Sequence, residues 1–420
     1  MKKSIAFFLS LTALLCLFTA CGEELSQTLT ETQTATAQTE AEPAITPVPV
    51  PFDPQKLYGL PVADSEMTEE ELRDLCVNYF LMQGTIPWKT KQSFLYDCHG
   101  AGNADENGNL HFEKGVLYGG LPYTRASSNL YTWLEYYDPE TGFLDVSGLK
   151  NNVGTVLGNN CSDAVFWAWA RVSTTISFTG TGEMTTVHGC IPLGDYEVDT
   201  TLDANRETKN TCRTNGEAKM YECYALLKKA DAVETTNTEG HTMMCTEDAH
   251  VERVNGVIDP NKSYITVIEQ HSSFKNLEID GMNVKVQSGA YNTYTFKEIF
   301  NKGYIPVTIA ELAGKKDIEK AWAKTDLPGD CTTAAIDAAK LTANYRLSKI
   351  IITFTNADGS VAATSVYHPS ESYMYEIPLS KASYKTSIRS LKKGTAYGLK
   401  IEVLLANGET LVAYEGNFTA

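Results

Sequence analysis

The sequence lacks any Cys-x-x-Cys pair, although it contains ten cysteines. Cysteines scattered in this way exclude a zinc knuckle and a dithiol redox motif, so we expect neither a metal nor another cofactor. Basic residues are also scarce: 35 Lys and Arg face 52 Asp and Glu, which gives a formal net charge of −17. This excess of acid argues against nucleic acid as a partner and against electrostatic docking on anionic lipid.

The N-terminal apolar run at residues 5–20 is shorter than the roughly 20 residues that a membrane-spanning helix needs. Two lysines precede it, and a short basic segment before such a run is typical of a secretory signal. Residues 17–21, Leu-Phe-Thr-Ala-Cys, resemble the cleavage box of bacterial lipoproteins. The resemblance implies a signal peptide over residues 1–20 and a lipid on Cys21, so that the exported protein is anchored to the outer face of the cell membrane.

Large apolar residues and basic residues are almost absent from the next segment, which is rich in Thr, Glu, Gln, Ala and Pro. Such a composition cannot bury enough surface to fold. We therefore expect a disordered tether over residues 21–55. The full length of 420 residues exceeds what one compact core holds, so we expect two folded parts after the tether.

Turn-forming residues lead into an apolar run at residues 158–169. This pattern predicts a loop followed by a buried helix, with Asn160 or Ser162 as the N-cap. Cys161 then lies in the first helical turn, where unpaired N–H groups and the helix dipole favour the nucleophilic thiolate. We interpret Cys161 as a catalytic nucleophile at the exposed tip of this helix. The alternative is a small core cysteine.

Two later segments supply partners for a thiol. His241 begins a short apolar strand, and residues 264–271 form a β-branched run that predicts another strand. Strand alternation places Glu269 and His271 on one face. A thiol, an imidazole and a carboxylate form a nucleophile, base and orienting group. His241 would pair with the thiolate, Glu269 would accept the other ring N–H, and His271 is the alternative third group or a substrate contact.

Further polar residues lie close to this predicted catalytic set in the sequence. Tyr123 and Arg125 follow a Gly-Gly turn upstream of the nucleophile and are candidates for substrate binding, with a packed tyrosine as the alternative. Asn160 and Gln270, each adjacent to a predicted catalytic residue, complete the substrate-binding set. Cys98 is a rival nucleophile because a histidine follows it. However, a loop rich in Gly, Asn and Asp comes next rather than a buried helix, so we prefer the nucleophile described above.

The C-terminal sequence changes to an apolar pattern of period two, visible in residues 350–354, 373–379 and 397–405. Short alternating strands separated by turn signals predict a β-sandwich of immunoglobulin or fibronectin type over residues 344–420. A linker over residues 326–343 would join it to the preceding part. We see no catalytic chemistry in this module, so its default role is packing, with a spacer or binding role as the alternative.

Three segments resemble known cell-wall enzymes. Asn160-Cys161-Ser162 before an apolar helix, and Gly-His-Thr-Met-Met at residues 240–244, resemble NlpC-type peptidases. Residues 265–271 look like the last site strand of the CHAP amidases, the cysteine, histidine-dependent amidohydrolases/peptidases. Both families have papain-like folds. The resemblance implies an α+β, papain-like domain over residues 56–325, in which a helix-borne cysteine packs on an antiparallel sheet.

The same resemblance implies a function. It indicates a surface-anchored cysteine amidase or endopeptidase that acts through an acyl-enzyme on Cys161. Its substrate would be an amide bond of the cell envelope, most naturally in the stem peptides of peptidoglycan. Two alternatives stay open: a non-catalytic surface lipoprotein that binds wall fragments or a host ligand, and a thiol acyltransferase on the same fold.

Overall fold

The computed structural model describes residues 44–97, 109–124, 126–178, 180–181, 183–186, 188–198, 211–235, 240–369, 374–382 and 384–420. Residues 1–44 and 45–420 form separate units, and the following description concerns the second. The fold is mixed α+β with 22% helix and 35% strand, which confirms the expected class. Within the described ranges, no helix is long and apolar enough to cross a membrane. The signal peptide, Cys21, most of the tether, Cys98 and Arg125 lie outside these ranges.

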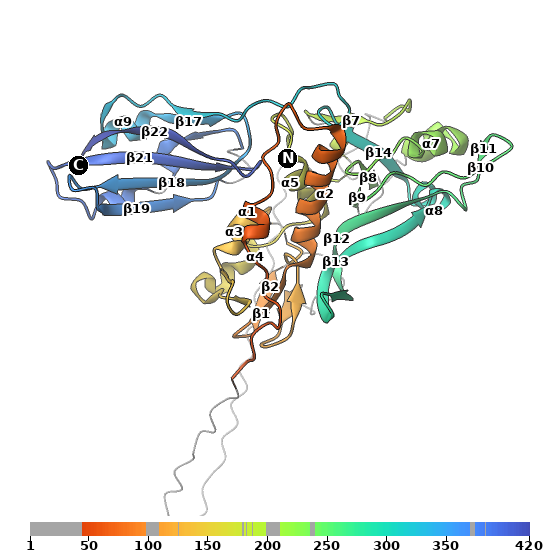
Figure 1. Ribbon diagram of the computed structural model, residues 1–420, viewed down its shortest axis with the longest axis horizontal. Helices are drawn as coiled ribbons and strands as arrows, with labels where there is room; N and C mark the ends of the chain where they lie inside the picture. Colours follow the sequence, from red (N-terminus) through yellow and green to blue (C-terminus); the bar gives the residue numbers. More distant parts are fainter. Residues whose placement is uncertain are drawn as a thin grey trace, which may run out of the picture. The chain divides into compact units, whose positions relative to one another are not determined.

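A ten-stranded sheet, counted within the described ranges, organises the first part, with the order β5-β6-β1-β4-β13-β12-β9-β8-β14-β7 (Figure 1). Its strands are β1 Pro87–Thr90, β4 Tyr118–Gly119, β5 Tyr137–Asp138, β6 Phe143–Leu144, β7 Cys190–Pro192, β8 Ala232–Thr235, β9 Thr242–Cys245, β12 Tyr264–Ile279, β13 Met282–Thr295 and β14 Tyr304–Ile309. The central strands β13, β12, β9, β8 and β14 pair antiparallel with their neighbours in that order, β9 with β12 and β14 with β8 among them.

The long β12–β13 hairpin turns at Asp280-Gly281, where both residues have positive φ values of 50° and 74°. Asp-Gly is a preferred pair for such a two-residue turn because glycine and aspartate tolerate this conformation. The antiparallel register of β12 with β9 then sets Glu269 opposite Met243. This register brings Glu269 of β12 close to the N-terminal end of β9.

Two helices pack on each other and on the centre of the sheet, α2 (Glu69–Thr85) and α5 (Cys161–Trp169) (Figure 1). α2 begins with a capping box, in which Thr68 and Glu71 each bond the backbone of the other. All nine residues of α5 are buried, as their apolar character predicts. The other elements of this part are α1 Gln55–Tyr58, β2 Phe94–Asp97, β3 Asn109–Phe112, α3 Leu130–Leu134, α4 Val153–Val156, α6 Thr211–Asn215, α7 Glu217–Tyr224, β10 Arg253–Val254, β11 Val257–Ile258 and α8 Phe296–Asn301.

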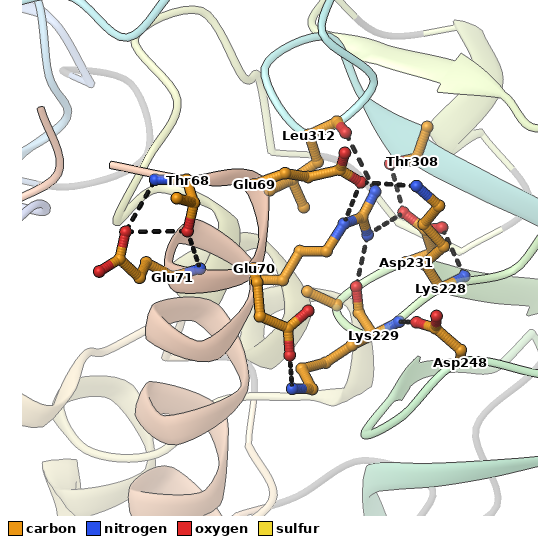
Figure 2. Close-up of polar contacts among 12 residues, drawn as sticks. Thr68, Glu69, Glu70, Glu71, Lys228, Lys229, Asp231, Asp248, Thr308 and Leu312 are labelled. Atoms are coloured by element: carbon orange, nitrogen blue, oxygen red, sulfur yellow. Dashed lines mark hydrogen bonds and ion pairs between the residues drawn. The ribbon is translucent and has the colours of Figure 1, made fainter. Parts of the chain in front are cut away.

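A buried ion pair fixes the start of α2 to the sheet. The Arg73 guanidinium lies 3.0 Å from Asp231 Oδ1 and donates to the carbonyl of Leu312 over 3.0 Å. Thr308 Oγ1 donates to the same carboxylate oxygen over 2.6 Å. Figure 2 shows Asp231, Thr308 and Leu312 gathered beside the first turn of α2, with Lys229 at the rim. Because each buried charge has partners, the pair sets how α2 lies on β8 and β14.

The C-terminal part contains a five-stranded sheet of order β16-β22-β21-β18-β19 and a three-stranded sheet of order β15-β17-β20, counted over the described residues. Its elements are β15 Ala323–Thr325, β16 Asp330–Thr332, α9 Thr333–Ala338, β17 Lys340–Ala343, β18 Leu347–Thr355, β19 Val361–Tyr367, β20 Glu376–Pro378, α10 Lys385–Ile388, β21 Ala396–Leu405 and β22 Thr410–Thr419. The expected linker over residues 326–343 is wrong. Cys331, Ile336 and Leu341 lie in the core of this part, because the segment supplies strands to both sheets.

The predicted tether is too long at its C-terminal end. Val48 and Phe52 are buried, and the Phe52 N–H donates to the Tyr137 hydroxyl over 2.7 Å. The backbone N–H of Val48 also bonds the carbonyl of Thr141. These apolar side chains are buried against the folded part. The folded part therefore begins near residue 45.

The two parts have separate apolar cores, and the C-terminal part also packs on the core of the first. Leu404 and Ala406 of the C-terminal part belong to the apolar cluster around α2 and α5. Arg171, which follows α5 and is fully buried, donates to the Ala406 carbonyl over 3.3 Å and to the Tyr131 hydroxyl over 2.7 Å. The C-terminal part is therefore continuous in packing with the helix that carries Cys161.

Candidate active site

Cys161 is the first residue of α5, and Asn160 is its N-cap, as predicted. The Asn160 side-chain oxygen accepts the Asp163 N–H over 3.0 Å and the Ser162 hydroxyl over 2.9 Å. This bonding satisfies a backbone donor that the helix leaves unpaired. The cap occupies the oxygen of Asn160, so this residue shapes the helix start, and its predicted substrate contact stays a prediction.

The loop before the nucleophile is held by buried amides. Asn159 donates to Gln83 Oε1 over 2.7 Å, and Gln83 in turn donates to the Ala164 carbonyl of α5 over 2.9 Å. Gly158 has a φ of +101°, and a Cβ there would lie 2.3 Å from the Pro122 carbonyl oxygen. Only glycine fits, so the chain approaches Cys161 along one fixed path.

His241 precedes β9 and lies between the thiol and the acid. Its Nε2 is 2.7 Å from Glu269 Oε2, and its ring lies close enough to the Cys161 sulfur to lower the pKa of that thiol. Because the carboxylate occupies Nε2, Nδ1 is the nitrogen left for sulfur. The His241 side chain is 21% exposed and that of Glu269 only 5%, so solvent reaches the site at the imidazole rather than at the acid.

The charges of these three groups support one another. Burial alone would raise the pKa of the Cys161 thiol, but the hydrogen bond and charge of His241 outweigh it, and the pKa lies below its usual value. Burial would likewise lower the pKa of His241, yet its bonds to Cys161 and Glu269 raise it to about 9. Burial opposes ionisation of Glu269, whereas His241 lowers its pKa to about 2. These shifts favour the thiolate form of Cys161, the imidazolium form of His241 and the carboxylate form of Glu269.

Glu269 has further partners that sequence reasoning missed. Its Oε1 atom accepts from Asn292 Nδ2 over 2.5 Å and from the Tyr294 hydroxyl over 3.1 Å. Lys275 Nζ lies 3.8 Å from the same oxygen. Asn292 and Tyr294 both lie on β13, and the register shift of this strand against β12 left no local sequence signal for their contact with Glu269.

The two residues after Glu269 behave differently from the prediction. Gln270 is fully buried and donates to the Leu121 carbonyl over 2.5 Å, so the predicted substrate contact is wrong. Strand alternation points it to the face opposite Glu269. His271 does not bond His241 in the described structure. Its buried Nε2 has no hydrogen-bond partner in the part of the chain that the structure describes, and burial lowers its pKa to about 4.

Tyr123, which was predicted to bind substrate, lies beside the nucleophile. Its hydroxyl is 3.9 Å from the Cys161 sulfur. Its backbone N–H donates to Gln287 Oε1 over 3.0 Å, and Gln287 Nε2 donates to the Ser272 carbonyl over 2.7 Å. The bridging amide of β13 therefore fixes the tyrosine relative to the sheet.

The expected exposed tip is wrong, because Cys161 is only 4% exposed. The Tyr123 hydroxyl, the His241 ring and the backbone N–H of Thr242 surround its sulfur. α5 packs against β9, and this contact covers the thiol on one side. The side chain of His241 remains partly exposed to solvent.

The chain matches no protein-family model, no curated protein and no solved structure. Function therefore has to be inferred from the chemistry of the site itself. Within the described ranges, no group of three or more His, Cys, Asp or Glu side chains is arranged to hold a metal ion.

Proposed function

We propose that the protein is a cysteine amidase or endopeptidase that acts through an acyl-enzyme on Cys161. The observation that carries this proposal is the chain of contacts from sulfur through His241 to Glu269, together with the lowered thiol pKa. A thiolate beside an oriented imidazolium is the arrangement that nucleophilic acyl transfer needs. A merely structural cysteine gains nothing from such partners.

The proposed reaction uses these three groups in turn. The Cys161 thiolate attacks the carbonyl carbon of the amide, and the backbone N–H of Cys161, unpaired within the helix at the N1 position, stabilises the oxyanion. The His241 imidazolium gives its proton to the leaving amine, and the C–N bond breaks to leave a thioester. His241 then takes a proton from water, the hydroxide attacks the thioester carbonyl, and the acid product leaves as the thiolate returns. Glu269 keeps the ring oriented throughout.

The fold assignment belongs to the same proposal. A helix-borne cysteine against an antiparallel sheet, with histidine and acid on neighbouring strands, supports a papain-like domain. The two sheets of the C-terminal part support an immunoglobulin-like module. The resemblance of residues 158–169, 240–244 and 265–271 to NlpC and CHAP enzymes supports the stem peptides of peptidoglycan as the substrate. The lipoprotein-like start of the chain supports location at the cell envelope.

Digestion of purified muropeptides tests the proposal. The wild-type protein should release new amine and acid termini, which liquid chromatography with mass spectrometry detects. Cys161→Ala should lower the rate by more than about a thousandfold. Cys190→Ala is the matched control, since Cys190 is also a buried free cysteine but lies on β7, away from the site, and it should retain activity. Unchanged muropeptides with folded wild-type protein would contradict the proposal.

Two rival functions are separated by the same samples. A thiol acyltransferase would join the acyl fragment to an added amine acceptor. Hydrolysis would instead give a free acid and a free amine, whose summed mass exceeds that of the substrate by one water. A non-catalytic binding protein is favoured by one observation, the 4% exposure of Cys161. It would retain muropeptides unchanged and would bind them equally well after Cys161→Ala.

A further inference from the structure

Glu269 is held at both oxygens by groups from three strands. Oε2 faces His241 before β9, whereas Oε1 receives Asn292 and Tyr294 from β13, with Lys275 of β12 at 3.8 Å. A buried carboxylate stays ionised only where donors replace the water that it has lost. The His241 contact uses one oxygen, so the donors on β13 decide how the other oxygen is held.

A bulge in β13 creates this arrangement. Pairing moves from Val267 opposite Asn292 to Glu269 opposite Gly289, so β13 has one more residue than β12 between these pairs. The extra chain includes Tyr291, which has a φ of +58° and is 62% exposed. A non-glycine residue in this conformation is uncommon and marks a backbone that its surroundings constrain.

Gly289 supplies the room that the amide needs. A Cβ at this position would lie 2.1 Å from Asn292 Nδ2 and 3.0 Å from Glu269 Oε1. Any larger residue would displace the amide from the carboxylate. The bulge and Gly289 together place the side-chain amide of Asn292 where it donates a hydrogen bond to Glu269.

We propose that Asn292 and Tyr294 are positioning residues, which hold Glu269 so that it keeps His241 charged and Cys161 ready for attack. The inference deepens the proposed function, because it concerns the same thiol. Neither residue touches the sulfur or a reacting atom, so both act through the acid. Loss of either donor leaves the carboxylate less stabilised and free to rotate, which weakens the support for the imidazolium and hence for the thiolate.

Several titratable groups bear on Glu269 and have to be considered in any pH experiment. They are His241 before β9, His271 and Lys275 on β12, Tyr294 on β13 and Tyr304 on β14. Lys275 and the His241 imidazolium stabilise the carboxylate, whereas His271, with a pKa of about 4, and the tyrosines are neutral near neutral pH. Replacement of Tyr294 by Phe or of Asn292 by Ala therefore changes donors without adding or removing a charge.

The test is the pH dependence of iodoacetamide alkylation at Cys161, followed by peptide mass spectrometry in the full-length protein. Asn292→Ala and Tyr294→Phe should move the acid limb of the rate profile to higher pH. The rate on that limb should fall roughly three- to thirtyfold, as expected from losing a hydrogen bond to a charged group. Above about pH 9 the rates should converge with the wild-type rate. Asn283→Ala, an exposed asparagine of the same strand, is the matched control and should leave the profile unchanged.

Each outcome decides the inference. A wild-type-like profile in both folded variants, or faster alkylation, overturns it. Tyr294→Phe keeps the ring, so it remains informative if Asn292→Ala fails to fold. A shifted profile in a protein that leaves muropeptides intact would uphold the positioning role while removing the proposed substrate. A wild-type Cys161 that is no more reactive than the other thiols would remove both.

Discussion

At the scale of single residues, Cys161 differs from the other described cysteines in its partners rather than in its exposure. All seven free cysteines in the described ranges are buried. At Cys76, burial raises the pKa of the thiol to about 12. At Cys161 burial acts in the same direction, but His241 outweighs it and the pKa falls. A buried thiol thus becomes a nucleophile only where a cation lies within hydrogen-bonding reach.

The acid of the site predicts how stability depends on pH. The pKa of Glu269 is about 2 in the folded protein against an ordinary 4.5, so its contribution is complete above about pH 4.5 and is lost as the pH falls through 2. Glu269→Gln removes this contribution. The wild-type advantage in unfolding free energy should be about 3 kcal/mol at pH 5 and should shrink towards pH 2.

Urea unfolding at several pH values measures this difference. A second decrease should appear on the basic side. The pKa of His241 is raised from 6.5 to about 9, so its contribution is complete below 6.5 and is lost as the pH rises through 9. A Glu269→Gln variant whose stability parallels the wild type across this whole range would show that the carboxylate and imidazole are not coupled.

At the scale of elements, the start of α5 affects both stability and reactivity, because the N-cap Asn160 is adjacent to Cys161. Asn160 caps the helix, and Asn160→Ala should lower the unfolding free energy by about 1 kcal/mol, because a backbone donor loses its acceptor. Asn160→Asp keeps the cap and should retain stability. However, it places a negative charge next to Cys161, so alkylation of the thiol should slow in this variant. Chemical denaturation and alkylation rates measure the two effects separately.

These paired variants separate a helix effect from a charge effect. If Asn160→Ala is as stable as the wild type, the cap does not stabilise α5. If Cys161 is alkylated as fast in Asn160→Asp as in the wild type, the negative charge at the cap does not affect the ionisation of the thiol.

Local patterns were sufficient to predict the elements that carry the site. The N-cap at Asn160 depends on neighbouring residues alone, and it was confirmed. The approach of His241 to Glu269 also followed from strand patterns. The strand alternation that placed Glu269 on the site face puts Gln270 on the opposite face. The predicted substrate contact of Gln270 was therefore avoidable, and the structure shows it to be wrong.

The rest of the site depends on features without a local signature. The bulge at Tyr291 changes which residues of β13 face the acid, and its position follows from pairing with β12 rather than from the sequence of β13. Asn292 therefore could not be assigned to Glu269 in advance. The cover over Cys161 is likewise a long-range effect, since Tyr123 comes from a distant loop.

At the scale of the whole molecule, the two parts should unfold together. Arg171 donates to the Ala406 carbonyl, the Tyr131 hydroxyl and the Pro61 carbonyl, and it is fully buried. Arg171→Ala leaves these acceptors without their donor and should lower the unfolding free energy by about 2–4 kcal/mol. Arg389→Ala, at an exposed arginine of the C-terminal part, is the control and should change it by less than about 0.5 kcal/mol.

Calorimetry checks this prediction and the packing between the two parts at once. The wild type should show one cooperative transition, because Leu404 and Ala406 belong to the core around α5. Two separate transitions, or an Arg171→Ala protein as stable as Arg389→Ala, would show that the parts are energetically independent. Residues 326–343 were mistaken for a linker because their strands pair only with strands far along the chain.

The reactivity of Cys161 tests the central claim most directly. The full-length protein is treated briefly with iodoacetamide at pH 6, and the label on each cysteine is measured by peptide mass spectrometry. Cys161 should react about a hundredfold faster than Cys76, Cys190 or Cys245, and His241→Ala should abolish the difference. Labelling of Cys161 no faster than of these buried thiols, or unchanged fast labelling in His241→Ala, would contradict a thiolate held by this histidine.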